Sequence, residues 1–491
     1  MSANNTLDSN LFKKIVSHAK EYGFVFQSSE VYDGLQAVYD YGQNGVELKN
    51  NIKTLWYKTM TQIADNVVGL DSAIFMHPLT WKASGHVDSF NDPMIDNKDS
   101  KKRYRADVLI EEKAASYENA GDKGKADALL QKMGKLLEKE DLDGVRNLII
   151  EENITCPISG TSNWTDVRQF NLMFSTQIGS VAEESETIYL RPETAQGIFV
   201  NFLNVQKTGR MKIPFGIAQI GKAFRNEIVA RQFTFRMREF EQMEMQFFVR
   251  PGTEMEWYNQ WKETRMKWHK ALGLPATKLR FHDHEKLAHY ANAAVDVEFQ
   301  FPFGFKEIEG IHSRTDFDLK NHELLSKKKM QYFDNEINQS YIPYVVETSA
   351  GADRVFLAVL CNAYTEETVG EGENQKERVY LKLHPALAPV KAAIFPLTKK
   401  DGLPEKAREI YKELRVEFPT VYEERDSIGK RYTRQDLIGT PFCIAVDHQT
   451  LEDNTVTIRH RDTLEQERVA ISELRVKIRR EISFKRIFEQ L

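Results

Sequence analysis

Residues 216–249, GIAQIGKAFRNEIVARQFTFRMREFEQMEMQFFV, decide the fold, because they read as two apolar-rich strands with a polar connection. This order predicts a long β-hairpin. Side chains two positions apart on a strand face the same way, so Met243, Met245 and Phe247 share an apolar face. The opposite face collects polar and charged groups. The side chains expected there are Arg225, Glu227, Arg236, Arg238, Phe240, Gln242 and Glu244.

This charged face predicts a charged ligand, since leaving unpaired charges desolvated is costly. Arginine forks suit phosphate oxygens, a carboxylate suits an exocyclic amine, and a phenyl ring can stack on a base. The alternative is an exposed strand face whose charges pair across the hairpin.

Residues 342–364, IPYVVETSAGADRVFLAVLCNAY, read as a strand followed by a helix that begins near Ala352. Glu347 and Ser349 share one face of that strand. Arg354 lies in the first helical turn, where a cation opposes the helix dipole, so a nearby phosphate would stabilise it. Pairing of this arginine with a neighbouring carboxylate is an equally good interpretation.

Residues 186–202, ETIYLRPETAQGIFVNF, read as a strand, an Arg-Pro step and a helix that starts near Thr194. Glu193 lies at this junction, where a carboxylate can favour the helix N-terminus without any ligand. Glu307 and Arg105 lie beside apolar residues in FGFKEIEGIHSRTDFDL and KKRYRADVLIEE. Taken alone, neither residue predicts a site.

The composition is that of a globular protein with several domains. The chain has 491 residues, 41% hydrophobic and 28% charged, with a formal net charge of −5. No apolar run approaches the roughly 18 residues that a membrane span needs. Because the net charge is slightly negative, nucleic-acid contacts would come from local basic patches. The cysteines, Cys156, Cys361 and Cys443, are too scattered for a disulfide framework, and the first residues read as neither signal nor transit peptide, so we expect a cytoplasmic protein.

The texture of the sequence predicts an α+β fold in four parts. Residues 1–97 open with an amphipathic helix and form the N-terminal part of the main domain. Residues 98–165 are rich in Lys and Glu and read as a helical insertion. Residues 166–386 are dense in aromatic and β-branched residues, which favours a large antiparallel sheet. Residues 387–491 alternate short strands with helices and read as a separate α/β domain.

Several of these segments together resemble the signature motifs of class II aminoacyl-tRNA synthetases. They are Phe224-Arg225-Asn226-Glu227, Arg236 with Phe240 downstream, and Gly351-Ala352-Asp353-Arg354. Within that class, YDYGQNGVELKNN, SGHVDSF, RYRAD, LRPETAQGIFVNF, REFEQMEMQFF and SAGADR resemble glycyl-tRNA synthetases of the homodimeric type. The resemblance covers nearly the whole chain. It implies dimerisation around residues 34–78 and an anticodon-binding domain that begins near Leu387.

The resemblance also implies roles at an adenylate-forming site. Arg225 would grip the α-phosphate of ATP, Glu227 would read the adenine amino group, and Phe240 would stack on the adenine opposite Arg354. Arg225 and Arg354 would be the catalytic residues, and Glu307 would help to hold Mg²⁺. The implied ATP residues are Arg225, Asn226, Glu227, Phe235, Arg236, Arg238, Phe240, Glu307, Ile308, Gly351, Asp353 and Arg354. The implied glycine residues are Arg105, Glu193, Phe240, Gln242, Glu244, Glu347 and Ser349.

An acidic pocket makes chemical sense for glycine, because a substrate without a side chain offers no apolar surface. The same crowding would reject alanine, whose methyl group costs about 1–3 kcal/mol in a filled pocket. In the implied reaction the glycine carboxylate attacks the α-phosphorus of ATP and releases pyrophosphate. A ribose hydroxyl of tRNA(Gly) then attacks the adenylate. Positioning and charge stabilisation carry both steps, and no protein nucleophile is needed.

A few positions depart from the family pattern. Gln43 stands where proline is usual, and Thr348 replaces a small residue but should point away from the pocket. In ITCPISG, Ser159 stands where a second cysteine would complete a CPxCG element, so we predict no zinc site. His282-Asp283-His284 resembles a metal cluster but reads as a solvated loop.

Three other interpretations fit parts of this sequence. A non-catalytic relative, such as an accessory subunit of a mitochondrial DNA polymerase, would typically lose the ATP arginines. A ligase for serine, threonine or proline needs a side-chain pocket or a metal. A free-standing adenylating enzyme would not need the C-terminal domain. That domain and the insertion are expected to bind tRNA, with Lys430, Arg431 and Arg434 as candidate phosphate contacts.

Overall fold

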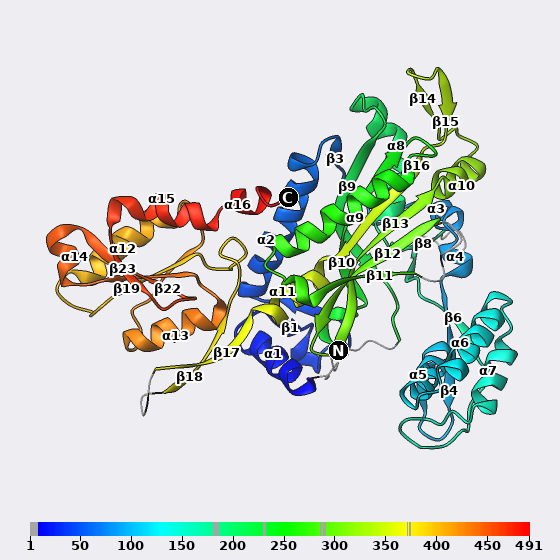
Figure 1. The fold of residues 1–491 in the computed structure, drawn as a ribbon, viewed down its shortest axis with the longest axis horizontal. Helices are drawn as coiled ribbons and strands as arrows, with labels where there is room; N and C mark the ends of the chain where they lie inside the picture. Colours follow the sequence, from blue (N-terminus) through cyan, green and yellow to red (C-terminus); the bar gives the residue numbers. More distant parts are fainter. Residues whose placement is uncertain are drawn as a thin grey trace.

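The computed structural model describes residues 8–179, 186–228, 232–284, 287, 291–370, 372 and 375–491. A seven-stranded sheet occupies the middle of the molecule, with a small helical domain at one side and an α/β domain at the other (Figure 1). The expected α+β architecture is confirmed. No helix in the described part of the chain is long and apolar enough to cross a membrane.

The central sheet has the strand order β11-β12-β13-β16-β10-β9-β3. Its neighbours are antiparallel, except that β3 runs parallel to β9. The strands are β3 (Val67–Gly69), β9 (Phe215–Phe224), β10 (Glu239–Val249), β11 (Leu279–Asp283), β12 (Ala293–Phe301), β13 (Gly304–Thr315) and β16 (Tyr344–Gly351).

Helices and short strand pairs surround this sheet. The helices are α1 (Ser9–Glu21), α2 (Gln43–Lys58), α3 (Pro78–Ala83), α4 (His86–Ser89), α8 (Ala195–Thr208), α9 (Glu254–Ala271), α10 (Phe317–Ser326) and α11 (Ala352–Ala363). The strand pairs are β1 (Val25–Gln27) with β2 (Tyr39–Tyr41), β7 (Ser175–Ile178) with β8 (Glu186–Tyr189), β14 (Tyr332–Asp334) with β15 (Gln339–Tyr341), and β17 (Tyr364–Val369) with β18 (Lys376–Leu381).

The predicted hairpin is confirmed as β9 and β10, which pair from Phe224 opposite Glu239 onward. The expected position of four charged residues on these strands is wrong. Strand β9 ends at Phe224 and β10 begins at Glu239, so Arg225, Glu227, Arg236 and Arg238 lie in the connection. Glu227 N–H donates to the Arg225 carbonyl at 2.7 Å, and this tight turn takes the chain out of the strand ladder. These side chains are therefore placed by a loop and not by strand alternation.

The two faces of the sheet are covered differently, and this difference creates the site. Met243, Met245 and Phe247 belong to one large core cluster with residues of α2, α9 and α11. On the other face, Phe248 and Val345 pack with α8. Helix α8 covers only that end of the face. Its remainder carries the polar residues of β10 and β16.

The insertion has a core of its own. Helices α5 (Ala106–Asn119), α6 (Lys123–Glu138) and α7 (Leu142–Glu151) pack around Leu109, Leu129 and Leu148. A three-stranded sheet, β5-β4-β6, ties them to the main domain. Its strands are β4 (Asn91–Asn97), β5 (Lys102–Arg105) and β6 (Arg168–Asn171), so it uses residues on both sides of the expected helical span.

The C-terminal domain is a five-stranded mixed sheet in the order β20-β19-β21-β22-β23. Its strands are β19 (Ala392–Pro396), β20 (Thr420–Tyr422), β21 (Phe442–Val446), β22 (Thr455–His460) and β23 (Gln466–Ala470). Its helices are α12 (Leu403–Leu414), α13 (Ile428–Ile438), α14 (His448–Asp453), α15 (Ile471–Ile482) and α16 (Lys485–Phe488).

Helix α16 leaves this domain and returns to the main one, as Figure 1 shows by the position of the C-terminus. Ile487 is fully buried in the same core cluster as Leu55 and Trp56 of α2. Phe484, Phe488 and Leu491 pack against that cluster. Full burial of a side chain of this size contributes about 1.5–3 kcal/mol. The C-terminal residues are thus part of the main core.

Candidate functional site: an anion cavity beside an acidic pocket

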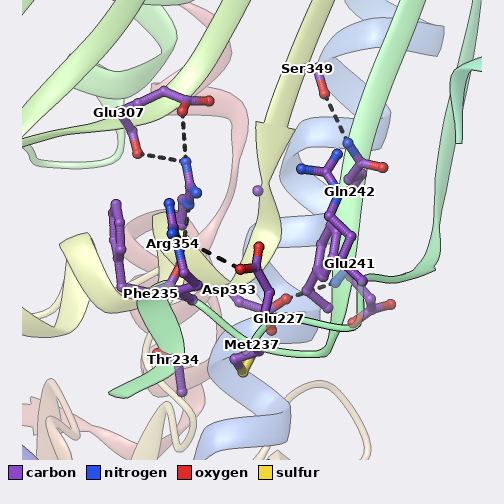
Figure 2. A pocket seen from close by; sticks show the side chains of 14 residues that line it. Glu227, Thr234, Phe235, Met237, Glu241, Gln242, Glu307, Ser349, Asp353 and Arg354 are labelled. Atoms are coloured by element: carbon purple, nitrogen blue, oxygen red, sulfur yellow. Dashed lines mark hydrogen bonds and ion pairs between the residues drawn. The ribbon is translucent and has the colours of Figure 1, made fainter. Parts of the chain in front are cut away.

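A cavity of about 140 Å³ lies where β10, β13, β16 and the connection between β9 and β10 meet the start of α11 (Figure 2). Most of the residues implied for ATP line it. The lining residues are Arg225, Glu227, Thr234, Phe235, Arg236, Met237, Phe240, Glu241, Gln242, Glu307, Ser349, Gly351, Asp353 and Arg354.

Arg225 is held between two aromatic rings. Its guanidinium carbon lies 5.3 Å from the Phe240 ring centre and 5.4 Å from that of Phe90. Its Nε donates to the Pro192 carbonyl at 3.1 Å. These contacts fix the side chain at the cavity wall, so its terminal nitrogens are held in place for an oxyanion ligand.

Arg354 forms the opposite wall. It donates through NH1 to the Glu307 carboxylate at 2.8 Å, and its guanidinium carbon lies 4.4 Å from the Phe235 ring centre. Figure 2 shows Phe235 beside this arginine. Of the two interpretations of Arg354, pairing with a carboxylate is realised, and the partner is Glu307.

Asp353 also lines the cavity, but its carboxylate holds the start of α11 in place. Its Oδ1 accepts from Lys49 at 2.6 Å and its Oδ2 accepts from Glu241 N–H at 2.7 Å. Asp353 is 2% exposed. The first turn of α11, and with it Arg354, is thereby fastened to β10 and α2.

Three of the residues implied for ATP lie outside the cavity lining. Asn226 donates its backbone N–H to the Leu172 carbonyl at 2.8 Å. Arg238 donates to the Glu227 carbonyl at 2.9 Å and so holds that loop in place. Ile308 is fully buried in the core, on the side of β13 away from Glu307.

An acidic pocket begins one step further along the same strands. Glu244 on β10 is 2% exposed, and Glu347 on β16 is 4% exposed. Glu193, just before α8, is close enough for its charge to raise the pKa of Glu244 and for the charge of Glu347 to act on it in turn. Gln242 and Ser349 lie between the cavity and this pocket, 3.4 Å apart. The predicted strand parities of these residues are confirmed.

Neighbouring basic side chains lower the pKa of two of the three carboxyl groups. Burial alone would raise the pKa of Glu193, but His86 and Arg314 lower it to about 2. Burial would also raise the pKa of Glu347, and the Arg314 charge and the His312 hydrogen bond lower it well below its usual range. Burial and the charges of the other two carboxylates raise the pKa of Glu244 well above its ordinary value. The pocket therefore combines two carboxyl groups of lowered pKa with one of raised pKa.

The side chains that pair with these three carboxyl groups are not among the residues predicted from the sequence. Arg314 donates to Glu347 at 3.0 Å and to Asp318 at 2.8 Å. His312 Nδ1 donates to the other oxygen of Glu347 at 2.8 Å. Gln246 lies between Glu244 and Glu347. The available signal was the spacing of His312 and Arg314, two cations on one face of a strand.

Arg105, implied for glycine, lies in the insertion. It pairs with Asp92 at 3.1 Å and Asp107 at 2.6 Å. It lines a second cavity of about 480 Å³ together with Arg236 and Lys306. The two cavities share Arg236 and Phe235, so Arg105 is a neighbour of the anion cavity and not a wall of it.

The cysteine and histidine motifs give no metal cage. Cys156 Sγ accepts from Ser159 N–H at 3.4 Å and lies 3.2 Å from the Tyr104 hydroxyl. His284 pairs with Asp296 at 2.9 Å at the end of strand β11, so this stretch is not a free loop. Among the described residues, no group of three or more His, Cys, Asp or Glu is placed to hold a metal ion.

A pH dependence follows from the raised pKa of Glu244. An entering ammonium favours the ionised carboxylate, so affinity for an amine should increase as pH rises through that pKa. For glycine, the substrate that the resemblance implies, we expect KM to fall with rising pH by at most about tenfold per unit, the limit for one proton. Steady-state ATP–pyrophosphate exchange between about pH 6 and 8.5 measures it. A glycine KM independent of pH would contradict this assignment.

The antiparallel sheet carries a cavity with an arginine on each of two walls, and α11 starts directly after β16 at this cavity. This arrangement defines a class II tRNA synthetase core. Residues 174–363 match the family model of the tRNA synthetase class II core domain (G, H, P, S and T). Residues 391–481 match the anticodon binding domain. Residues 92–127 and 119–172 match the glycyl-tRNA synthetase insertion domain 1.

Curated proteins named glycine–tRNA ligase match almost the whole chain. The protein from Chlorobaculum tepidum is 55% identical over 461 residues, which are 94% of this chain and 97% of its own. Those from Macrococcus caseolyticus and Staphylococcus saprophyticus are 53% and 54% identical over 473 residues, 96% of this chain and 98% of theirs. The chain belongs to the glycine–tRNA ligase family.

Proposed function

We infer that the anion cavity and the acidic pocket carry the two-step reaction of this family. The chain is a ligase that activates glycine with ATP and transfers it to the 3′ end of tRNA(Gly) in protein synthesis. The observation that carries this function is the direct succession, along β10 and β16, of an arginine-walled cavity and a pocket of three carboxylates. A nucleoside triphosphate and an amino acid without a side chain fit these two neighbours.

We propose that Arg225 and Arg354 are the catalytic residues, because both touch the space where the phosphates would lie. Arg225, fixed between its rings, would stabilise charge on the α-phosphate during attack. Glu227 would accept from the adenine amino group, and Phe240 would stack on the base. Catalysis of this kind needs preorganised charge and no change in protein protonation.

Glycine would lie with its ammonium among Glu193, Glu244 and Glu347 and its carboxylate towards Arg225. Gln242 and Ser349, at the border, would orient it. The carboxylates of Glu193 and Glu347 would stabilise the ammonium, and the added positive charge would favour ionisation of Glu244. A methyl group on the α-carbon would meet the packed wall of this pocket.

A Mg²⁺ ion bound with ATP would neutralise charge on the phosphates and on the departing pyrophosphate. The donors fit this role, since Glu307 is a half-exposed carboxylate at the cavity wall and Mg²⁺ commonly takes one or two carboxylates plus phosphate oxygens. Glu307 would be its protein ligand.

The C-terminal domain would receive the anticodon, and the second cavity, with Arg105, Arg236 and Lys306, is suited to the backbone of the tRNA 3′ end. The expected phosphate contacts on α13 need a correction. Arg431 is 4% exposed and bonded to the Pro396 carbonyl, so it cannot contact RNA. Arg434 pairs with Asp426 at 2.8 Å but is partly exposed, so it remains a candidate together with the exposed Lys430.

We propose a homodimer through the segment that includes β3. This strand has a single neighbour in the sheet, and the segments before and after it in the sequence carry exposed apolar side chains. They are Tyr57, Ile63, Phe75 and Leu79. We expect Phe75→Asp to shift the mass in analytical ultracentrifugation from two chains to one. Val416→Asp, at a similarly exposed apolar residue of the C-terminal domain, is the matched control and should leave the mass unchanged.

We further propose that the protein works in the cytoplasm, where its three substrates are found. Its cysteines Cys156, Cys361 and Cys443 are buried and unpaired, as is usual in a reducing compartment.

Glycine-dependent ATP–pyrophosphate exchange tests the function, with serine, alanine and threonine as parallel substrates. We expect exchange with glycine alone, followed by charging of tRNA(Gly). Exchange with another amino acid, or with none, would overturn the proposal.

A further inference from the structure

Gln246 is fully buried on β10 and lies directly opposite Glu347 on β16. Its amide nitrogen donates to Glu244 Oε1 at 2.8 Å and to Glu347 Oε2 at 2.6 Å. One neutral NH₂ group therefore bridges two carboxyl groups of the acidic pocket, which is the contact pattern that a ligand ammonium would make.

With this bridge, each of the four carboxyl oxygens has a protein donor. Glu244 Oε2 accepts from the Thr194 hydroxyl, and Glu347 Oε1 accepts from His312. Glu347 Oε2 also accepts from Arg314. The amide oxygen of Gln246 has no hydrogen-bond partner among the described residues. A buried acceptor without a partner costs free energy. The two hydrogen bonds to the carboxyl groups therefore set the orientation of the amide, although its oxygen then has no partner among the described residues.

Other side chains at position 246 would not give the same result. A lysine would supply the positive charge itself and compete with the substrate. A glutamate would add a carboxylate to a crowded site, and a methionine would leave two buried carboxyl groups facing each other without a donor. Of these side chains, only the amide donates to both carboxyl groups and leaves their negative charge available to the substrate.

We propose that Gln246 is a positioning residue that holds Glu244 and Glu347 at the separation that accepts one small ammonium. It sets the affinity for glycine through these two groups. This inference rests on the proposed function, since it concerns the glycine pocket of that reaction.

The test compares Gln246→Met, which keeps the length without the donor, and Gln246→Glu, which keeps the shape and reverses the hydrogen bonding. We expect the KM for glycine in ATP–pyrophosphate exchange to rise about tenfold in the first and further in the second. The KM for ATP should stay within about twofold. The fall of the glycine KM with pH should move to higher pH, because an unbridged pair holds a proton more tightly.

The matched control is Thr348→Val. Thr348 is fully buried next to Glu347, but it faces the apolar side of β16 and its hydroxyl has no partner among the described residues. Its glycine KM and pH profile should equal those of the unchanged protein. The other charged groups around the pair stay the same in every variant, and they are Glu193, His86, His312, Arg314 and Asp318.

A glycine KM within twofold of the unchanged protein, with the same pH profile, would overturn the proposal. Equal losses for ATP and glycine, or failure of both Gln246 variants to fold by thermal denaturation, would assign a purely structural role and overturn it as well. Absence of glycine exchange in the unchanged protein would instead reject the proposed function, so the two failures are distinguishable.

Discussion

Arg225→Ala should lower kcat/KM for ATP in glycine-dependent exchange by about 10²–10³-fold, the usual loss when one preorganised donor to a transition-state anion is removed. The side chain is fixed by Phe90, Phe240 and the Pro192 carbonyl, so it loses little entropy when phosphate arrives. Because its donor nitrogens face the cavity, the loss should appear mainly in kcat.

The control for this prediction is Arg250→Ala. Arg250 follows the far end of β10 and pairs with Asp334 at 2.7 Å and Glu336 at 3.1 Å, away from the cavity. Its exchange kinetics should be unchanged. An Arg225 variant with kcat/KM within threefold of the unchanged protein would remove this arginine from the catalytic site.

Glu347→Gln should raise the KM for glycine by about 10–100-fold, which corresponds to the roughly 1.5–3 kcal/mol of one charged hydrogen bond. This carboxylate accepts from His312, Arg314 and Gln246. Its neutralisation removes the charge that the ammonium would meet and takes one carboxylate partner from Arg314, which still pairs with Asp318. Exchange rates at varied glycine and saturating ATP measure the effect.

Glu336→Gln serves as the matched control, because its side chain is 80% exposed and contacts Arg250 only at the surface. A Glu347 variant that melts at the same temperature and keeps its glycine KM would exclude this group from the amino-acid pocket. Relief of discrimination against alanine is not expected, since the packed wall remains.

Local patterns in the sequence were sufficient to predict the hairpin and the two polar strand faces. Strand alternation placed Gln242 and Glu244 together, and Glu347 with Ser349, because alternation is a property of the backbone alone. It failed for Arg225 and Arg236, since it assumed that the strands continue through the loop. Where a ladder ends depends on hydrogen bonds that alternation does not contain.

The partners of the acidic pocket could not be predicted because they come from distant segments. Glu193 meets His86 across more than 100 positions, and Glu347 meets Gln246 through a register between strands that are not consecutive. Strand order and register are set by global packing, which local periodicity does not encode.

The buried position of Ile487 has a consequence for synthesis of the chain on the ribosome. The catalytic core begins with residues of α1 and α2 and is completed by residues 484–491. A nascent chain therefore cannot complete this core until these residues have left the ribosomal tunnel, whatever its earlier domains have done. Truncated products, made when translation stops early, would expose the apolar surface of α2 and be marked for degradation.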